Sequence, residues 1–385
     1  MKVTLSVVGK FHTFDLAREL ARHGALQAIF TGYPRFKLRH EGLDADKVHT
    51  FPWVNTPYMA FPRRDLLGDT LVRQWEYLNC ASFDRYTAWR MPPCDVFVGL
   101  SSATLISGQR ARAIGARFVC DRGSSHIRTQ DELLREEHAA WGLPHNGPDP
   151  RIIEREEAEY AEADAITVPS GFSARTFVAR GVPAHKVHRL SYGVNIAQFH
   201  KSAEPDAKHF DVLFAGGASA RKGVPYLLQA FKALQHPGKR LFFAGSFAPE
   251  FRTQMEARGL WSSEIELLGH LHWDALRDRM SRSHALVLPS VEEGFGLVIP
   301  QALACGCPVI ATENTGGPDL FADGEAGYIL PIRRADLIAD RLQLLADDPL
   351  TRERLSGAAQ RVVQRIGGWQ TYGDQAMGIY QSLLT

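Results

Sequence analysis

Residues 211–224 read DVLFAGGASARKGV and join an apolar run to an amphipathic pattern that continues to Leu234. The run predicts a buried strand over Asp211–Phe214, and the pattern predicts a helix over Val224–Leu234. The small residues between them let backbone N–H groups approach an anion, and a helix N-terminus adds partial positive charge. Arg221 and Lys222 add full charges at this point. The loop therefore either binds phosphate or is a tight turn with two solvated cations. It is not a Walker A loop, because GxxxxGK followed by Ser or Thr is missing.

The same alternation of short β-branched runs with helical patterns continues along most of the chain and is typical of βαβ units in parallel sheets. In the first half it predicts strands at Lys2–Val8, Ala25–Phe30, Asp95–Val98, Arg117–Cys120, Ala165–Val168 and Val187–Leu190, with helices at Phe14–Arg22, Arg151–Ala161 and Ser170–Arg180. In the second half it predicts further strands at Leu241–Phe243, Glu264–Leu267, Ala285–Leu288 and Pro308–Ala311, with helices at Pro249–Arg258, Asp274–Ser281 and Leu297–Ala304. The polar stretch 201–210 interrupts both patterns and predicts a linker. We therefore predict an α/β protein of two doubly wound domains facing a central cleft, where such sheets bind ligands.

The composition of the 385-residue chain excludes several classes of protein. It is 45% hydrophobic and 23% charged, so it can bury sizeable cores. Its 44 Lys and Arg against 43 Asp and Glu give a formal charge of +1, so no global basic field exists to hold nucleic acid. The five cysteines form no CxxC pair and no HExxH motif occurs, so we predict neither a disulfide framework nor a metal site. Without a signal-peptide pattern, we expect a soluble, cytoplasmic protein.

A second glycine-rich loop, Pro289–Leu297, reads PSVEEGFGL and again joins a predicted strand to a predicted helix. Its glycines free the backbone at the start of the helix, and the Glu293 carboxylate is suited to accept hydrogen bonds from sugar hydroxyls. A GxGxxG motif fails because Ile299 takes the last glycine position. Taken alone, the loop is either a sugar-binding loop or a glycine-rich turn with solvated carboxylates.

Residues 33–93 do not follow the strand–helix alternation. The stretch from Phe51 to Trp89 holds nine aromatic residues in 39, and the segment YPRFKLRH at 33–40 mixes basic and aromatic side chains. One interpretation is a helical insertion that packs the aromatics into its own core. The other is an acceptor pocket or an edge that touches a membrane, where Arg35, Lys37 and Arg39 would attract anionic lipid weakly and in a salt-sensitive way.

Several further motifs are spaced along the chain in a fixed order. They are Val168-Pro-Ser170, Arg180-Gly-Val-Pro183, Lys186-Val-His188, Tyr192-Gly-Val-Asn195, Arg221-Lys-Gly223, Leu288-Pro-Ser290, Glu293-Gly-Phe-Gly-Leu297, Ala304-Cys-Gly-Cys-Pro-Val309, Thr315-Gly-Gly-Pro318, and Asp323-Gly followed by Gly327. In this order the motifs resemble those of the retaining family 4 glycosyltransferases, also called glycosyltransferase group 1, which have the GT-B fold. The resemblance covers most of the second half of the chain and runs through the first.

The resemblance implies an organisation and a chemistry. It implies an acceptor-binding domain over 1–203, a donor-binding domain over 204–368, and a closing helix over 369–385 that crosses back to the first domain. The implied donor is a nucleoside diphosphate sugar, and the acceptor is a hydroxyl of a glycan, a lipid-linked intermediate or a small molecule. No metal or other cofactor is implied, because Arg221, Lys222 and helix N-termini would neutralise the leaving diphosphate.

The resemblance also implies roles for particular residues. The catalytic group comprises His126, Arg221, Lys222 and Glu293. The donor-binding group comprises Gly216, Gly217, Arg221, Lys222, His270, Glu293, Gly294, Phe295, Gly296, Leu297 and Gln301. The acceptor-binding group comprises Gly9, Lys10, His12 and Ser124. Because Ser124 and His126 follow the predicted strand Arg117–Cys120, both are expected to face the cleft, although a structural role is the alternative for any single histidine.

Two positions depart from the family pattern. The family signature Glu-x7-Glu begins at Glu293, but its second position is Gln301, which loses the charge-assisted part of a hydrogen bond to ribose, roughly 1 kcal/mol. We expect weaker or rearranged ribose binding. The other departure is Gly217, where many relatives carry an arginine, and we expect Arg221 to take over that role.

The mechanism that follows from the resemblance is front-face attack. No carboxylate nucleophile can be named from the sequence, so the departing phosphate oxygen would take the acceptor proton while Arg221 and Lys222 stabilise its charge. Two alternatives stay open. One is a nucleotide-sugar epimerase of the same fold, which needs no acceptor. The other is a non-catalytic subunit that binds sugar nucleotides, suggested by Gln301.

Overall fold

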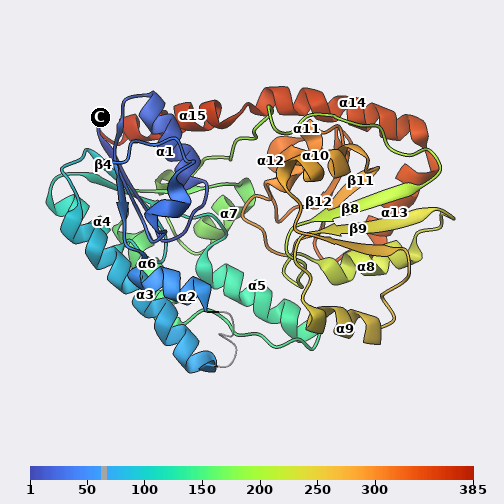
Figure 1. The fold of residues 1–385 in the computed structure, drawn as a ribbon, viewed down its shortest axis with the longest axis horizontal. Helices are drawn as coiled ribbons and strands as arrows, with labels where there is room; N and C mark the ends of the chain where they lie inside the picture. Colours follow the sequence, from blue (N-terminus) through green and yellow to red (C-terminus); the bar gives the residue numbers. More distant parts are fainter. Residues whose placement is uncertain (62–66) are drawn as a thin grey trace.

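The structure is a computed structural model that describes residues 1–61 and 67–385. Its strands form two sheets, one of seven strands in the order β3-β2-β1-β4-β5-β6-β7 and one of six in the order β10-β9-β8-β11-β12-β13. Neighbouring strands pair in parallel in both sheets. Figure 1 shows the N-terminal sheet with its helices on the left and the C-terminal sheet on the right. The predicted α/β class with two doubly wound, Rossmann-like domains is confirmed.

The bounds of the elements are as follows. The strands are β1 Val3–Val7, β2 Leu26–Thr31, β3 Val48–Thr50, β4 Val96–Leu100, β5 Arg117–Asp121, β6 Ala165–Val168, β7 Val187–Arg189, β8 Phe210–Ala215, β9 Lys239–Ala244, β10 Ile265–Gly269, β11 Ala285–Leu288, β12 Val309–Thr312 and β13 Gly327–Leu330. The helices are α1 Thr13–Arg22, α2 Pro52–Ala60, α3 Asp69–Arg90, α4 Leu105–Ala113, α5 Ile127–Ala140, α6 Pro150–Glu162, α7 Gly171–Ala179, α8 Val224–Ala233, α9 Pro249–Ala257, α10 Trp273–Ser281, α11 Val298–Ala304, α12 Gly317–Leu320, α13 Ala335–Asp347, α14 Pro349–Ile366 and α15 Trp369–Ser382.

The central strands are almost wholly apolar because both faces of a parallel sheet are covered. All six residues of β8 are buried, including Asp211. Its carboxylate is held there by the guanidinium groups of Arg240, at 2.7 Å, and Arg279, at 2.6 Å. After β8 the chain turns into α8 through Gly223, whose φ of +68° is a left-handed conformation that favours glycine. A side chain there would also lie 1.9 Å from the Pro289 carbonyl oxygen.

The predicted strands and helices are present, and several elements that the sequence pattern did not predict are added, among them β3, β13, α4, α5, α12, α13 and α14. The edge strands β3 and β13 have only three and four residues, and β13 begins at a glycine. Short edge strands give little periodic signal. Helices α4 and α5 were also missed, because neither carries the continuous apolar stripe that marks a helix in sequence. Ser170, where the predicted helix begins, caps α7, its Oγ accepting a hydrogen bond from the Ser173 N–H at 3.1 Å.

Within the aromatic-rich region at 33–93, of which residues 62–66 lie outside the described part, α2 and α3 lie against the first sheet. The rings of Phe51 and Tyr86 stack with centroids 4.8 Å apart, which supports the interpretation of a self-packed insertion, whereas Phe83 is buried in a cluster with Ala28 and Phe30 of β2. Other aromatics do not pack, since Trp53 is 76% exposed and Trp89 is 77% exposed. The region is therefore a helical insertion with both a packed and an exposed aromatic part.

The last two helices run along one edge of the molecule, α14 beside the C-terminal sheet and α15 against α1 of the N-terminal one (Figure 1). Arg22 of α1 donates to Asp374 of α15 at 2.7 Å. Gly373 allows this close approach, because a side chain at that position would meet Glu19 at 2.4 Å. The sequence-predicted boundary at 203/204 falls in the segment between β7 and β8.

Candidate active site

The two glycine-rich loops lie next to each other because β8 and β11 are neighbours at the point where the strand order of the second sheet reverses. The carboxyl ends of parallel strands meet at one edge, so the β8–α8 loop and the β11–α11 loop face the same space. Lys222 from the first loop donates to the Glu293 carboxylate of the second at 2.5 Å. Arg221 Nε donates to the Glu292 carboxylate at 2.8 Å. Each predicted phosphate-binding cation is thus paired with a carboxylate.

Other donor residues predicted from sequence belong to the same two loops. Gly216 has φ +131°, and a side chain built there would contact the Lys222 side chain at 3.7 Å. Gly217 lies in the same loop, where a Cβ would come within 3.2 Å of Ser246 Oγ. Gly296 has φ +83° and lets the second loop turn into α11. The side chain of Phe295 is buried, with its ring 5.3 Å from that of Tyr192. Phe295 therefore shapes the loop from behind and exposes no ring to a ligand.

Gln301 and His270 are the two residues that were predicted to bind the donor but lie outside these loops. Gln301 is half-buried on α11, and among the described residues its side-chain amide makes no hydrogen bond. The amide is therefore free to pair with a ligand. His270 is exposed and follows β10, the edge strand that β9 separates from β8. Within residues 1–61 and 67–385, no hydrogen bond, ion pair or ring contact joins the His270 side chain to the paired loops, although the Gly269 carbonyl before it accepts from the Gly245 N–H at 2.7 Å and Gly245 packs against Gly216.

The seam between the domains passes directly over the second loop. A Cβ built on Gly294 would lie 1.9 Å from the Gly123 carbonyl oxygen of the first domain, so the two backbones touch. Ser173 Oγ of α7 donates to the Gly294 carbonyl at 3.4 Å. Away from this loop, Asp319 accepts from the Gly171 N–H at 2.7 Å, and Arg333 pairs with the buried Glu137 at 2.8 Å. These contacts join the two domains along the seam.

A cavity of about 1050 Å³ opens beside the seam, within the first domain. All four predicted acceptor residues line it. The lining comprises Val8, Gly9, Lys10, Phe11, His12, Phe14, Asp15, Arg18, Tyr33, Glu41, Asn55, Met59, Cys80, Leu100, Ser101, Ser102, Arg122, Gly123, Ser124, Tyr192 and Leu297. Leu297 comes from the predicted donor loop, whereas Tyr33, Asn55, Met59 and Cys80 come from the aromatic-rich region. That region therefore supplies one wall of the cavity.

His12 is the most firmly held of the acceptor residues. It precedes α1 and is buried, and its Nε2 lies 2.6 Å from Asp121 Oδ2 at the end of β5. Thr167 donates to the other carboxylate oxygen of Asp121 at 2.8 Å, and the Tyr192 ring lies against the imidazole with centroids 4.3 Å apart. Because a carboxylate only accepts, the imidazole donates through Nε2. Asp121 thereby fixes the tautomer and the orientation of the ring.

Lys10 is also paired inside the lining. Its ammonium group contacts the carboxylate of Glu41, whose other oxygen accepts from Arg18 at 2.9 Å. Burial raises the pKa of the neighbouring Asp15 above its usual value, although the Arg18 guanidinium opposes this. The cavity therefore holds balanced charges at one end and apolar side chains elsewhere.

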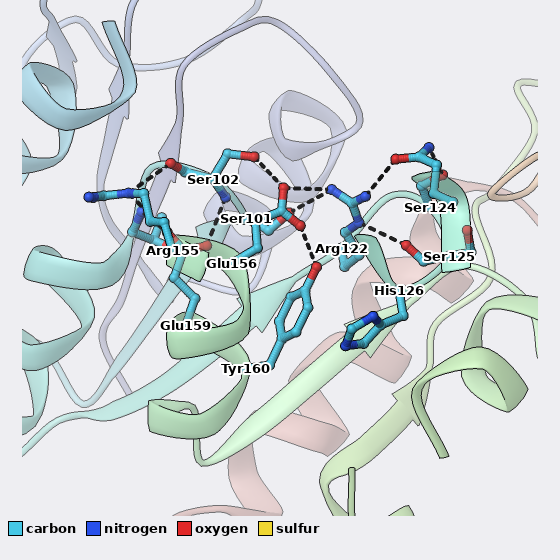
Figure 2. Close-up of polar contacts among 12 residues, drawn as sticks. Ser101, Ser102, Arg122, Ser124, Ser125, His126, Arg155, Glu156, Glu159 and Tyr160 are labelled. Atoms are coloured by element: carbon cyan, nitrogen blue, oxygen red, sulfur yellow. Dashed lines mark hydrogen bonds and ion pairs between the residues drawn. The ribbon is translucent and has the colours of Figure 1, made fainter. Parts of the chain in front are cut away.

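The structure corrects the expected placement of His126. Its side chain does not face the cleft, because α5 begins directly after it and the ring caps that helix, Nδ1 accepting from the Arg128 N–H at 3.3 Å. The imidazole is 4% exposed and lies 5.1 Å from both the Tyr160 and Phe177 rings. Burial lowers its pKa to about 4, so it is neutral at pH 7. Figure 2 shows the ring turned away from Ser124 and Arg122. This placement does not support contact with a transferred sugar.

Sequence reasoning missed a set of buried polar residues behind the cavity. Glu159 of α6 accepts hydrogen bonds from the Ser102 N–H at 2.7 Å and the Thr104 N–H at 2.8 Å. Burial raises the pKa of Glu159 to about 8. Glu156, on the same helix, pairs with Arg122 at 2.8 Å (Figure 2). The signal was the acidic pattern of the predicted helix at 151–161. Charge on a helix usually faces water, so the pattern gave no reason to place it inside.

No group of three or more His, Cys, Asp or Glu side chains within residues 1–61 and 67–385 is arranged to hold a metal ion. Over the same residues, no helix combines the length and the apolar character that a bilayer crossing requires.

Two family models match consecutive parts of the chain. The model described as glycosyl transferase 4-like domain matches residues 11–193, and the model described as glycosyl transferases group 1 matches residues 195–362. The first match contains the cavity lining from Phe11 to Tyr192, and the second contains both paired loops. Together they define a two-domain glycosyltransferase architecture.

Curated relatives are similar over part of their length. α-D-Kanosaminyltransferase of Streptomyces kanamyceticus is 29% identical over 249 residues, which are 59% of this chain and 64% of that protein. D-Inositol 3-phosphate glycosyltransferase of Streptomyces bingchenggensis is 32% identical over 313 residues, 76% of this chain and 62% of that protein. The chain spans about three fifths of the length of the curated relatives it matches.

Solved structures share the fold over the whole chain. Sucrose-phosphate synthase (tll1590) from Thermosynechococcus elongatus has a TM-score of 0.75 at 21% identity, covering 100% of this chain and 99% of that one. Anabaena Alr3699/HepE, solved with UDP and glucose, has a TM-score of 0.73 at 16% identity, covering 99% and 100%. The architecture is therefore that of the GT-B glycosyltransferases. The chain belongs to the group 1, or family 4, glycosyltransferases, as its motifs indicated.

Proposed function

We propose that this protein transfers a sugar from a nucleoside diphosphate sugar to a hydroxyl acceptor, with retention of configuration. The observation that carries the proposal is the junction of three features at one seam: the Arg221–Lys222 loop, the Glu293 loop and the cavity that holds His12. The names of its relatives agree with this activity, since they are glycosyltransferases, and Anabaena HepE was also solved with UDP-glucose.

In the proposed mechanism, Lys222 and Arg221 stabilise the negative charge that grows on the diphosphate as it leaves. Preorganised cations in a site that excludes water are effective for this purpose, because they need no reorganisation during the reaction. Glu293 pairs with the Lys222 ammonium, and donor binding would release it to accept hydrogen bonds from the sugar hydroxyls. The acceptor oxygen bonds to the anomeric carbon as the bond from that carbon to the diphosphate oxygen breaks, and the departing oxygen takes the acceptor proton on the same face of the sugar. No metal is required in this scheme.

His12 and the cavity are assigned to the acceptor. The Asp121 carboxylate holds the His12 ring, so the imidazole presents a fixed edge to a bound hydroxyl. The cavity volume of about 1050 Å³ is large enough for an acceptor of sugar size or more. We propose a glycan, a lipid-linked intermediate or a small polyhydroxylated molecule, and a cytoplasmic location where nucleotide sugars are available.

The proposal is tested by thermal unfolding with UDP-, GDP-, ADP- and dTDP-glucose, followed by product analysis. A donor at 100 times its Kd stabilises the fold by about 2.7 kcal/mol, so the true nucleotide should raise the Tm while the others do not. Transfer to an added hydroxyl with a retained anomeric configuration is the expected product. Release of a rearranged sugar without any acceptor would indicate an epimerase. Binding without turnover would indicate a non-catalytic subunit.

Gln301→Glu tests the departure from the family pattern. If the half-buried amide of Gln301 faces the ribose, a carboxylate there should tighten donor binding roughly tenfold, equivalent to about 1.4 kcal/mol. Calorimetric titration of the nucleotide diphosphate measures this directly. Weaker binding in a folded variant would mean that this chain holds its nucleotide in another way.

The exposed aromatic side chains suggest contact with lipid. Phe36 is 60% exposed and Trp53 is 76% exposed. Arg35, which directly precedes Phe36, donates to the carbonyls of Ala45 at 2.8 Å and Val48 at 2.6 Å, so its charge is held at this surface. We expect a mostly soluble protein that visits the cytoplasmic membrane face.

The measurement is co-sedimentation with neutral and with anionic vesicles at low and high salt. We expect weak binding to anionic vesicles that is lost at high salt and in a variant with Arg35, Lys37 and Arg39 neutralised, because each cation contributes about 1 kcal/mol near the surface. Equal, negligible binding in every condition would favour a soluble sugar or small-molecule acceptor.

A further inference from the structure

Glu292 is a fully buried carboxylate at the seam between the two domains. On the first domain, Ser124 Oγ donates to Oε1 at 2.6 Å and Ser125 Oγ donates to it at 2.7 Å. Gln130 Nε2, on α5, donates to Oε2 at 3.1 Å. On the second domain, Arg221 Nε donates to the same Oε2 at 2.8 Å. One carboxylate therefore joins three residues of the acceptor domain to a cation of the donor domain.

These contacts continue into the acceptor domain. Gln130 uses its carbonyl oxygen to accept from Arg122 Nη2 at 2.9 Å, while its NH₂ group faces Glu292. Arg122 Nη1 in turn donates to Glu156 at 2.8 Å, and Arg122 Nε donates to the Ser125 carbonyl at 3.1 Å. Figure 2 shows Arg122 between Glu156 and the loop that carries Ser124 and Ser125. The donors to Glu292 are thus fixed from behind by a buried ion pair.

The charge state of Glu292 agrees with this arrangement. Burial alone would raise the pKa of its carboxyl, but Arg221 and the hydroxyls of Ser124 and Ser125 lower it to about 2. The side chain is therefore ionised at neutral pH. An ionised carboxylate without partners is costly to bury, so its partners from both domains must be present together. Separation of the domains would remove the three donors of the first domain and leave the Arg221–Glu292 pair in water.

The Arg221 guanidinium group is held through its Nε atom. Its Nε donates to both the carboxylate and the carbonyl of Glu292, the latter at 3.2 Å. Within the described residues, neither Nη atom of Arg221 has a hydrogen-bond partner, and the side chain is 36% exposed. The two terminal NH₂ groups are therefore available beside Lys222, on the loop proposed to receive the diphosphate.

We infer that Glu292 is a positioning residue that sets the Arg221 guanidinium toward the diphosphate only when Ser124, Ser125 and Gln130 of the closed acceptor domain complete its hydrogen bonds. The inference rests on the proposed function and deepens it, because it makes a phosphate-binding group of the donor domain depend on closure. Interfaces between domains that are polar and of modest size commonly open and close. The device would delay full stabilisation of the leaving group until the acceptor domain is in place.

The experiment is a double-mutant cycle of Glu292→Gln and Arg221→Ala in the full chain, measured with UDP-, GDP-, ADP- and dTDP-glucose. Glu292→Gln keeps the shape of the side chain but removes the charge that orients Arg221. We expect it to lower kcat by roughly tenfold or more, since hydrogen bonds to charged groups have this magnitude, with a smaller change in KM. In the Arg221→Ala background it should cost less than a further twofold, because the residue that it positions is gone.

A second variant tests the inference independently, in case Glu292→Gln does not fold. Ser124→Ala combined with Ser125→Ala removes two donors from the acceptor domain and leaves the donor domain untouched, so it should reproduce the loss in kcat. The matched control is Ser263→Ala, which removes a hydroxyl that donates to an exposed carboxylate, that of Glu264, at 3.3 Å. Ser263 lies just before β10, and among the described residues it forms no hydrogen bond with Arg221, Glu292 or the first domain, so the control should keep kcat within about twofold.

The outcomes separate the inference from the proposed function. Wild-type protein that neither binds nor cleaves any of the four nucleotide sugars removes the proposed function, but closure is still measured by amide exchange over residues 123–130, which Glu292→Gln should accelerate. Losses that add in the double mutant, a Ser263→Ala variant as slow as Glu292→Gln, or unchanged exchange in residues 123–130 would each overturn the positioning role.

Discussion

Lys222→Ala is expected to lower the rate of sugar transfer by about 10²- to 10³-fold, the usual cost of removing one electrostatic stabiliser of a transition state. The Lys222 ammonium is 2.5 Å from the Glu293 carboxylate, and the neighbouring Arg221 on the same loop is paired with Glu292. Its charge is needed most when the diphosphate leaves, so kcat should fall more than donor affinity. Steady-state transfer kinetics and calorimetric binding of the nucleotide diphosphate give the two quantities.

The matched control is Lys232→Ala, which removes the same charge from an exposed position on α8. Lys232 Nζ donates to the Gly259 carbonyl at 2.9 Å, away from both glycine-rich loops. This control should retain wild-type kinetics and a similar Tm. A Lys222→Ala enzyme within threefold of wild type would remove Lys222 from the catalytic assignment and leave its pair with Glu293 as a structural contact.

Gly294→Ala is expected to cost on the order of 10²-fold in kcat/KM, because misplacement of reacting groups by about 1 Å is enough for such a loss. The added methyl group would lie 1.9 Å from the Gly123 carbonyl oxygen and 3.0 Å from Ser124 Cα. Both neighbours are backbone atoms, so no flexible side chain can move aside. The added methyl group must therefore push the two domains apart. The hydrophobic core of each domain, which packs on its own sheet, is unaffected. Kinetics, nucleotide binding and the Tm are measured together.

The control for this substitution is Gly378→Ala on α15, where nothing lies within 4 Å of the added methyl group. Alanine is favoured over glycine inside a helix by roughly 0.5–1 kcal/mol, so this variant should be fully active and slightly more stable. If Gly294→Ala kept wild-type kcat/KM, the closed contact between Gly123 and Gly294 would not be part of the catalytic cycle. Nucleotide binding should persist in Gly294→Ala, since the Lys222 loop belongs to one domain.

The sequence by itself determined the architecture. Parallel strands covered on both faces are short apolar runs, and the helices between them carry their own period, so the alternation was visible without any tertiary information. The glycine-rich loops were visible for a similar reason, since a strand that turns directly into a helix beside an anion needs small residues. The resemblance then identified the family. It also assigned a phosphate-binding role to Arg221 and Lys222 in one loop and a sugar-binding role to Glu293 in the other.

Only the tertiary structure decided which way individual side chains face. His126 was predicted from its position after a strand, but it is the last residue before α5, and capping that helix turns its ring into the core. Glu292 and Glu293 are chemically the same and adjacent in sequence. The bend of the loop sends Glu293 to Lys222 and Glu292 across the seam to Ser124 and Ser125.

The same limit applies to the buried charges behind the cavity. Glu156 and Glu159 belong to a helix whose acidic pattern is typical of a solvated surface, yet both are buried because Arg122, Ser102 and Thr104 converge on them from other segments. A buried charge is tolerated only where its partners meet it, and those partners lie 34 to 57 residues away along the chain. The periodicity of a local sequence shows which face of a helix or strand packs against apolar neighbours. It does not show which polar groups from distant segments come together, because those contacts form only when the sheets and their loops assemble.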